Sequence, residues 1–482
     1  MPRGFRLVLV LAVAGASAFQ TPQPAAPGQV DRVADAFATG WLLHDTNGDG
    51  IADFLSGKIV VPAHPSAAEN AAAANLAARA GYATTGLTPP VVVTAAEDPG
   101  SGPRIWVGRD AVPASVAGEL APFELAADEG GVFAIGGNLA VIGNNDGGLM
   151  AAADAYAARA PYQWRAGGEK LGAIADAVRE AVPEAKVELA GVTYLHGKAG
   201  IHRAFLSGSG ITTEALNKAL ASTHLAAVHG LAVVGGESAE SAKTEAAIPA
   251  VPASGAAGAA GGDAAAGAAA AGPTRLDLAT LYTSRGLFGS AGRIPVAASS
   301  NAHLYVPAGP EGVAMANLAA RMGLETTGIT LPIASPADAA TVRDVRTQAV
   351  IAGNAAVAQE AERKMRAEDT ASEQAETPLA AGEGELRVVD SAFGRRAAVI
   401  ARGDESGQAA AIGVLADRFP NLWEQGKAYL SVEEIRYDLH RFFSVRSSSG
   451  QAAAALYHLD RWMTAAGENA GAKEMCIRDR DS

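Results

Sequence analysis

A segment of seventeen residues occurs twice in this chain, and this repeat constrains the fold more than any other feature. Residues 74–90 read ANLAARAGYATTGLTPP and residues 316–332 read ANLAARMGLETTGITLP, with twelve identical positions. The surrounding features recur in the same order, and an Arg-x-Pro-x-x-Trp pattern closes each copy at Trp164 and Trp423. Such self-similarity indicates two diverged copies of one structural module.

Within each copy, short runs rich in Val and Ile alternate with longer helical patterns, which is the signature of an α/β fold. We therefore predict two homologous α/β modules, each a parallel or mixed sheet with covering helices. The helical pattern at residues 67–79 has a face of small residues, among them Ala71, Ala74 and Ala78, which permits close packing. Gly81 is expected to end this helix, as C-terminal glycines often do.

The segment between the copies has a different pattern. It reads as a helix at 171–182, strands at 186–195 and 201–207, a helix at 212–222 and a strand at 225–234. This order predicts a small ferredoxin-like α+β insert. Residues 250–272 are almost wholly Ala, Gly, Pro and Ser and predict a flexible linker. After the second copy, residues 431–443 and 450–465 predict a C-terminal helical hairpin.

Both ends of the chain have distinctive sequences. A charged start, an apolar run from Leu7 to Ala14 and the small residues before Phe19 predict a signal peptide cleaved after Ala18. The apolar run is far shorter than the roughly 20 residues of a spanning helix, so we expect no integral membrane segment after cleavage. At the other end, Met475–Arg480 resembles a translated sequencing adapter, and we expect the natural chain to continue past about Lys473.

These observations divide the chain into eight segments. They are a signal peptide (1–18), a leader with a calcium-type loop (19–57), the first α/β module (58–165), the ferredoxin-like insert (166–236), the Ala/Gly-rich linker (237–274), the second α/β module (275–425), the helical hairpin (426–468) and the artefactual tail (469–482).

Charge and cysteine content exclude several functional classes. The chain has 51 acidic and 38 basic residues, a net charge of -13, which repels nucleic acid. Its one cysteine, Cys476, excludes an intramolecular disulfide, thiolate zinc sites, iron–sulfur clusters and cysteine catalysis. The predicted signal peptide favours a secreted or periplasmic location.

The clearest candidate site is a calcium-type loop at residues 45–53, DTNGDGIAD. Oxygen ligands at alternate positions with a glycine at the sixth suit a hard cation. The predicted ligands are Asp45, Asn47, Asp49, the Ile51 carbonyl and Asp53. The alternative is an Asp/Asn/Gly-rich turn without an ion. The second copy lacks the acidic residues, which favours one structural calcium ion.

Two weaker motifs have ordinary structural explanations. The turn at residues 143–148, GNNDGG, could hold an anion at a helix N-terminus, but an Asp146 helix cap with glycines for a tight turn is the favoured interpretation. His196 and His202 flank a predicted hairpin and could meet across it. Without a third ligand they are more often structural than metal-binding.

The order of Ile105–Gly108, Glu129–Gly130, the turn at 143–148 and Pro161–Trp164 resembles the non-catalytic N-terminal α/β domains of secreted glycoside hydrolases. It is also similar to bacterial envelope proteins such as the periplasmic regulatory subunit of cellulose synthase. The calcium-type loop resembles those of dockerins and thrombospondin type-3 repeats. The resemblance implies an accessory module beside a polysaccharide-acting partner, so the expected partners are a polysaccharide or an envelope protein. It supplies no catalytic residue.

Two functions stay open on the sequence. The first is an exported envelope binding or scaffold protein, stabilised by calcium, without a recognisable catalytic site. The second is the N-terminal accessory portion of a larger secreted hydrolase acting on polysaccharide, whose catalytic domain is missing from this chain. The two hypotheses predict the same features within these residues.

Overall fold

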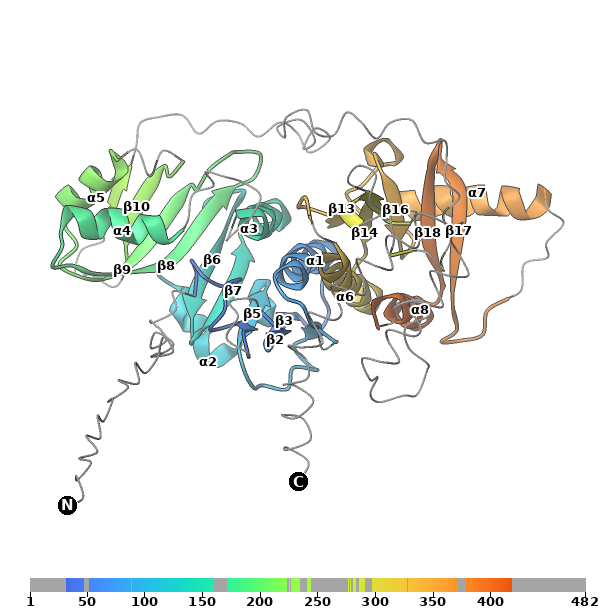
Figure 1. The fold of residues 1–482 in the computed structure, drawn as a ribbon, viewed down its shortest axis with the longest axis horizontal. Helices are drawn as coiled ribbons and strands as arrows, with labels where there is room; N and C mark the ends of the chain where they lie inside the picture. Colours follow the sequence, from blue (N-terminus) through green and yellow to red (C-terminus); the bar gives the residue numbers. More distant parts are fainter. Residues whose placement is uncertain are drawn as a thin grey trace, which may run out of the picture.

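The computed structural model describes residues 32–46, 52–87, 89–159, 171–222, 225, 227–234, 241–243, 276, 278, 281–282, 286–290, 297–326, 328–371 and 378–417. It is an α/β structure with two large sheets, as the alternation of patterns predicted. The helices α1, α3, α6 and α8 lie between the two sheets (Figure 1).

The first module has the strand order β4-β3-β5-β7-β6. Its elements are β3 (Lys58–Val61), α1 (Ala67–Tyr82), β4 (Val92–Thr94), β5 (Arg104–Val107), η1 (Arg109–Ala111), α2 (Ala114–Ala117), η2 (Gly118–Leu120), β6 (Glu129–Ile135), β7 (Asn138–Gly143) and α3 (Asp146–Arg159). All neighbouring strands are parallel except the β6–β7 hairpin. Before them, β1 (Leu43–His44) and β2 (Phe54–Leu55) form a small antiparallel ladder.

The second module repeats this topology in the order β15-β14-β16-β18-β17. Its elements are β14 (Ala302–Val306), α6 (Gly309–Glu325), β15 (Ala334–Pro336), η5 (Val342–Asp344), β16 (Gln348–Ile351), α7 (Ala356–Ala371), β17 (Gly384–Phe393), β18 (Arg396–Gly403) and α8 (Glu405–Asp417), preceded by the β12 (Phe288–Ser290) and β13 (Ala297–Ser300) pair. Again only the last hairpin, β17–β18, is antiparallel within the sheet.

The insert has the predicted element order. It comprises α4 (Gly172–Ala181), β8 (Lys186–Leu195), β9 (Arg203–Ser209), α5 (Thr213–Leu220) and β10 (Gly230–Val233). Thr212 caps α5 by accepting a hydrogen bond from the Ala215 amide, as its position predicted. The sequence did not indicate that β8 pairs with β6. Through this pairing the three strands of the insert, followed by β11, extend the first sheet to nine strands.

One stretch of the predicted linker forms a strand. β11 (Ser241–Lys243) lies within the range 237–274 and pairs antiparallel with β10. The prediction rested on composition, and an edge strand of three residues that bonds through its backbone needs no apolar pattern. The Ala/Gly-rich residues 250–272 lie outside the described residues.

The two copies of the repeat pack against each other through α1 and α6. A Cβ on Gly81 would lie 2.0 Å from the Ala320 carbonyl oxygen, and a Cβ on Gly323 would lie 2.0 Å from the Ala78 oxygen. Both glycines therefore permit backbone contact between the helices. The expectation that Gly81 ends its helix was wrong: α1 continues to Tyr82, because this glycine serves packing between helices.

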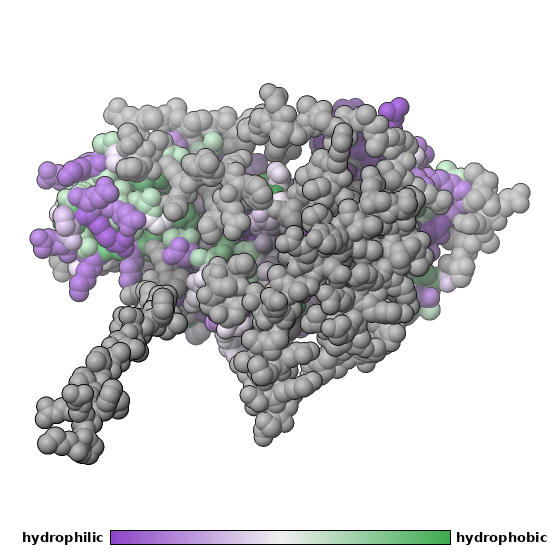
Figure 2. Space-filling view, in the orientation of Figure 1, coloured by the Kyte–Doolittle hydropathy of each residue, from purple (hydrophilic) through white to green (hydrophobic). Residues whose placement is uncertain are grey.

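Apolar side chains fill both faces of each sheet. The largest core lies between the sheets and their facing helices, with Ile59, Leu76 and Leu318 fully buried. The far face of the first sheet is covered around Phe123 and Phe133, and the far face of the second by α7. Hydrophilic residues gather over α4 and α5 at one end of the molecule and over α7 at the other (Figure 2).

Several predictions fall outside the described residues: the signal peptide, the helical hairpin, the C-terminal tail, Trp164 and Trp423. Within the described part of the chain, none of the helices is long and apolar enough to cross a membrane.

Candidate functional site

Two asparagines, the buried Asn75 and the half-buried Asn317, join the modules by reciprocal hydrogen bonds, one from each copy of the repeat. Asn75 of α1 accepts from the backbone amides of Ile333 and Ala334, both at 3.0 Å, and donates to the Ala334 carbonyl at 3.0 Å. Its side chain thus hydrogen-bonds to the backbone at the start of β15, an edge strand of the other module. A side chain that pairs buried backbone groups in this way fixes position as well as packing.

Asn317 of α6 makes the equivalent contacts in the opposite direction. It accepts from the amides of Val91 and Val92 at 2.7 and 2.9 Å, and it donates to the Val92 carbonyl at 2.9 Å. The two asparagines occupy the same position in the repeat, so the junction has approximate twofold symmetry within a single chain. Local sequence patterns did not indicate the role of these side chains, although the presence of asparagine in both copies was an available signal.

One carboxyl group breaks this symmetry. Asp154 of α3 accepts a hydrogen bond from Asn75 Nδ2 at 2.7 Å, and burial raises the pKa of Asp154 to about 7. The corresponding position in α8 is Gly413, which has open space around it. The carboxyl group is therefore a titratable component of the junction on the side of the first module.

A cleft of about 480 Å³ lies beside this junction. It is lined by Ser66, Glu69 and Thr94 of the first module and by Gly309, Pro310 and Glu405 of the second. These residues stand at the carboxyl ends of β3, β4 and β14 and at the N-termini of α1, α6 and α8. In α/β sheets this end of the strands is where ligands characteristically bind.

The base of the cleft is fixed by contacts between the two modules. Asn70 donates from Nδ2 to the carbonyls of Pro307 and Gly309, both at 3.0 Å. The Gly309 amide donates to the Pro65 carbonyl at 3.0 Å. A Cβ on Gly312 would lie 2.1 Å from Asn70 Nδ2, so only glycine leaves room for this side chain. These three hydrogen bonds thus join the two walls of the cleft.

Two carboxyl groups, those of Glu69 and Glu405, line the cleft together with His64, and Glu311 lies outside the lining. Glu69 and Ser66 form a capping box, in which the Ser66 amide donates to Glu69 Oε2 at 2.8 Å and the Glu69 amide donates to Ser66 Oγ at 3.1 Å. Burial raises the pKa of Glu69. Glu311, at the same helical position in α6, is only 6% exposed, and burial, followed by the charge of Glu405, raises its pKa.

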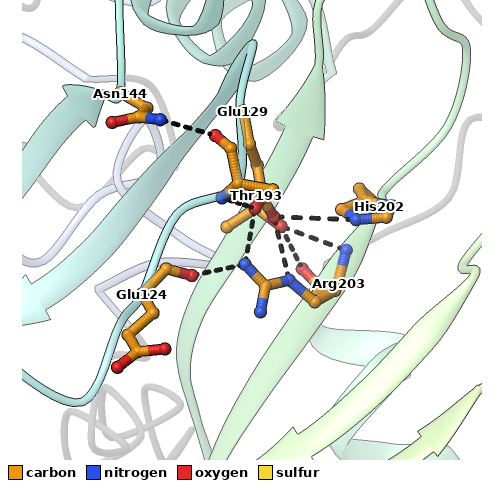
Figure 3. A network of polar contacts seen from close by, with 7 residues as sticks. Glu124, Glu129, Asn144, Thr193, His202 and Arg203 are labelled. Atoms are coloured by element: carbon orange, nitrogen blue, oxygen red, sulfur yellow. Dashed lines mark hydrogen bonds and ion pairs between the residues drawn. The ribbon is translucent and has the colours of Figure 1, made fainter.

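A polar network of side chains joins the insert to the first module (Figure 3). Glu129 at the start of β6 is fully buried. Arg203 of β9 binds both its oxygens, Nε to Oε1 at 2.9 Å and Nη2 to Oε2 at 2.5 Å, and the Ala126 amide donates to Oε2 at 2.8 Å. Burial opposes the charge of Glu129, but the hydrogen bonds from Arg203 and Thr193 outweigh it and hold its pKa below the usual value.

The two histidines singled out from the sequence, His196 and His202, have different neighbours. His202 Nε2 lies 4.0 Å from Glu129 Oε1 at the margin of this network, while His196 packs against Gly147. Over the described residues, no group of three or more His, Cys, Asp or Glu side chains is arranged to hold a metal ion. We therefore assign His202 to the polar network.

The turn at residues 143–148 is a helix cap, with one correction. Asn145 caps α3, because its Oδ1 accepts from the Gly148 amide at 2.8 Å, whereas Asp146 is the first residue of the helix. Gly148 and Gly130 allow α3 to approach β6, since a Cβ on Gly130 would lie 1.9 Å from the Gly148 oxygen. In the second module Asp404 caps α8 in the same way, at 2.8 Å from the Gly407 amide.

The calcium-type loop is described only at its two ends. Asn47, Asp49 and Ile51 lie outside the described residues, whereas Asp45 and Asp53 are within them. Asp53 is buried, and its Oδ2 accepts from the amide and the hydroxyl of Thr46 at 2.8 and 2.6 Å. The β1–β2 ladder therefore brings the two ends of the loop together, as a closed cation loop requires.

This loop is attached to the repeated Thr-Thr-Gly turn. The Ala52 carbonyl accepts hydrogen bonds from the Thr85 amide at 2.9 Å and from the Thr84 hydroxyl at 3.3 Å. The loop is thereby coupled to the end of α1, the helix that forms the module junction.

Comparisons of the chain with models of known protein families, with curated proteins and with solved structures gave no match.

Proposed function

We propose that this chain is an exported binding or scaffold protein of the cell envelope whose ligand occupies the cleft between the two modules. The observation that supports this most directly is the reciprocal pairing of Asn75 and Asn317. It uses buried polar groups to hold two modules in one arrangement, with the cleft at their shared strand ends. Fixed geometry lowers the entropic cost of binding.

The lining of the cleft favours a neutral ligand rich in hydroxyl groups. Ser66 and Thr94 carry hydroxyls, and the carboxyl groups of Glu69 and Glu405 are hydrogen-bond acceptors for sugar hydroxyls. Phosphate or sulfate groups would meet these carboxyl groups unfavourably. A segment of polysaccharide fits both this chemistry and the expected extracytoplasmic location.

The test is isothermal titration calorimetry with cellopentaose and chitopentaose as probes. Ala63 is an exposed residue that lines the cleft, and Ala63→Trp fills it. Ala96→Trp is the matched control, because Ala96 is exposed and lies outside the lining. We expect binding of at least one probe to weaken more than about tenfold in Ala63→Trp, which is about 1.4 kcal/mol. Equal binding by both variants, or no binding of either probe, would contradict the cleft as the glycan site.

We further propose that the loop at residues 45–53 binds one structural calcium ion through Asp45, Asn47, Asp49, the Ile51 carbonyl and Asp53. Calcium at a hundredfold excess over its Kd stabilises the folded state by about 2.7 kcal/mol. We expect calcium to raise the melting temperature relative to a chelator, and Asp49→Ala to abolish the difference. Asp176→Ala, an exposed change in α4, is the control. Identical melting with calcium and with chelator would refute the site.

A further inference from the structure

The outer edge of the second sheet is a long strand, β17, with one irregularity between Val389 and Phe393. β17 has ten residues and, among the described elements, pairs only with β18. Its register with β18 is continuous from Gly384 to Val389. An edge strand of this kind presents unpaired backbone amides and carbonyls to any strand that can lie beside it.

The first module shows what occupies the equivalent edge. There β6 receives β8 in antiparallel pairing, from Glu129 opposite Leu195 to Phe133 opposite Gly191. The chain reaches β8 directly after α3 and α4. The insert is therefore the element that completes the sheet of the first copy.

The beginning of β17 retains the local structure that β8 covers in β6. Glu383 corresponds to Glu129, and its Oε2 accepts from the Ala380 amide at 2.9 Å, as Glu129 Oε2 accepts from the Ala126 amide at 2.8 Å. Yet Glu383 is exposed and Glu129 is fully buried. The two glutamates therefore make the same local hydrogen bond, but only Glu129 is covered by a further strand.

The sequence after α8 follows that after α3. Each helix leads into Arg-x-Pro-x-x-Trp, and a leucine stands seven residues beyond each tryptophan, Leu171 and Leu430. An amphipathic helical pattern then begins in both copies. In the second it continues at Val432, Ile435 and Leu439 and gives way to the alternating run FSVRS at 443–447, which is a strand pattern.

We propose that the segment of this same chain at residues 443–449 adds to the free edge of β17 as an antiparallel strand, as β8 adds to β6. The helix predicted from residue 431 would then correspond to α4. The proposed strand would replace the turn between the two helices of the predicted hairpin. The repeating unit of the protein is thereby larger than the α/β module, because it includes the strand that closes the sheet.

Chain length and charge agree with this occupant. Lys186 of β8 follows Arg159 by 27 residues, and Phe443 follows Asp417 by 26, so the chain is long enough to return to the edge. Glu383 is exposed next to the start of β17, and the segment carries Arg446. Opposite charges on neighbouring strands favour their pairing.

The experiment is hydrogen–deuterium exchange on the full chain and on two variants. Val445→Pro removes a backbone donor and disfavours a strand, whereas Val445→Thr keeps both the amide and the β-branched shape and is the matched control. In the unmodified chain we expect the β17 amides at residues 384–389 that do not bond to β18 to be protected. Val445→Pro should accelerate their exchange more than about tenfold, and Val445→Thr should leave it nearly unchanged.

Amides of β16 report whether the variant is folded, because they lie inside the sheet. Unchanged exchange in β16 with faster exchange in β17 supports the proposal. Fast exchange of the outward β17 amides in the unmodified chain, or protection that Val445→Pro does not alter, overturns it. Protection that disappears on dilution, together with a dimer by light scattering, would assign the edge to a second copy and overturn it as well.

Discussion

Replacing Asn75 with alanine tests whether the reciprocal asparagines hold the modules together. The change removes four hydrogen bonds, to the Ile333 and Ala334 amides, the Ala334 carbonyl and Asp154. At about 1 kcal/mol each, and with buried backbone groups left unpaired, we expect a loss of about 4 kcal/mol in the free energy of unfolding. A loss of this size is a large fraction of the total free energy of unfolding of an ordinary domain.

The assay is urea denaturation followed by tryptophan fluorescence and circular dichroism. Asn317→Ala removes the equivalent set of contacts and should cost a similar amount, because the two side chains are related by the repeat. Asn217→Ala is the control, since Asn217 is exposed on α5 and its replacement should change stability by less than about 0.5 kcal/mol. A loss below about 1 kcal/mol for both Asn75→Ala and Asn317→Ala would refute the argument that these side chains join the modules.

Three further predictions follow from the same junction and from the insert. Gly323→Ala should destabilise the protein by about 1–3 kcal/mol through overlap with α1, whereas Gly413→Ala, with open space around it, should stabilise α8 by up to about 1 kcal/mol; equal effects in thermal melts would contradict this. Because burial raises the pKa of Asp154 to about 7, its contribution to stability should be present below about pH 4 and be lost as the pH rises through 7, and Asp154→Asn should flatten this dependence in denaturation at pH 5 and pH 8. Arg203→Ala leaves Glu129 buried without its partner and should cost about 3–5 kcal/mol in urea melts, and a change below 1 kcal/mol would show that the pair is not required.

The sequence was informative wherever a local pattern determines a local structure. Alternating apolar runs indicated the α/β class of both modules and the element order of the insert, and Thr212 marked the start of α5. The modules contain more strands than these runs indicated, because each sheet also includes a β-hairpin. The cap of α3 was misplaced by one residue, at Asp146 and not Asn145, because both side chains are good caps and only backbone geometry selects between them. The predicted calcium ligands are a local pattern too, and three of them lie outside the described residues.

The candidate site could not be derived in the same way. Asn75 and Asn317 are ordinary polar residues within Ala-rich helices, and nothing local shows that each completes a strand of the other module. Similarly, Glu129 reads as one acidic residue among many until β9 places Arg203 beside it. Contacts between residues more than two hundred positions apart depend on how the modules dock, which periodicity does not encode.

The sequence by itself determined that the chain contains one α/β module twice, with an αββαβ insert between the copies, because repeats and periodicity are properties of neighbouring residues. Tertiary structure alone decided that α1 and α6 meet through glycines, that an asparagine of each module bonds to the edge strand of the other, and that the insert extends the first sheet. The physical reason is that buried backbone groups at an edge must find partners, and which partners lie within reach is settled only when the modules pack.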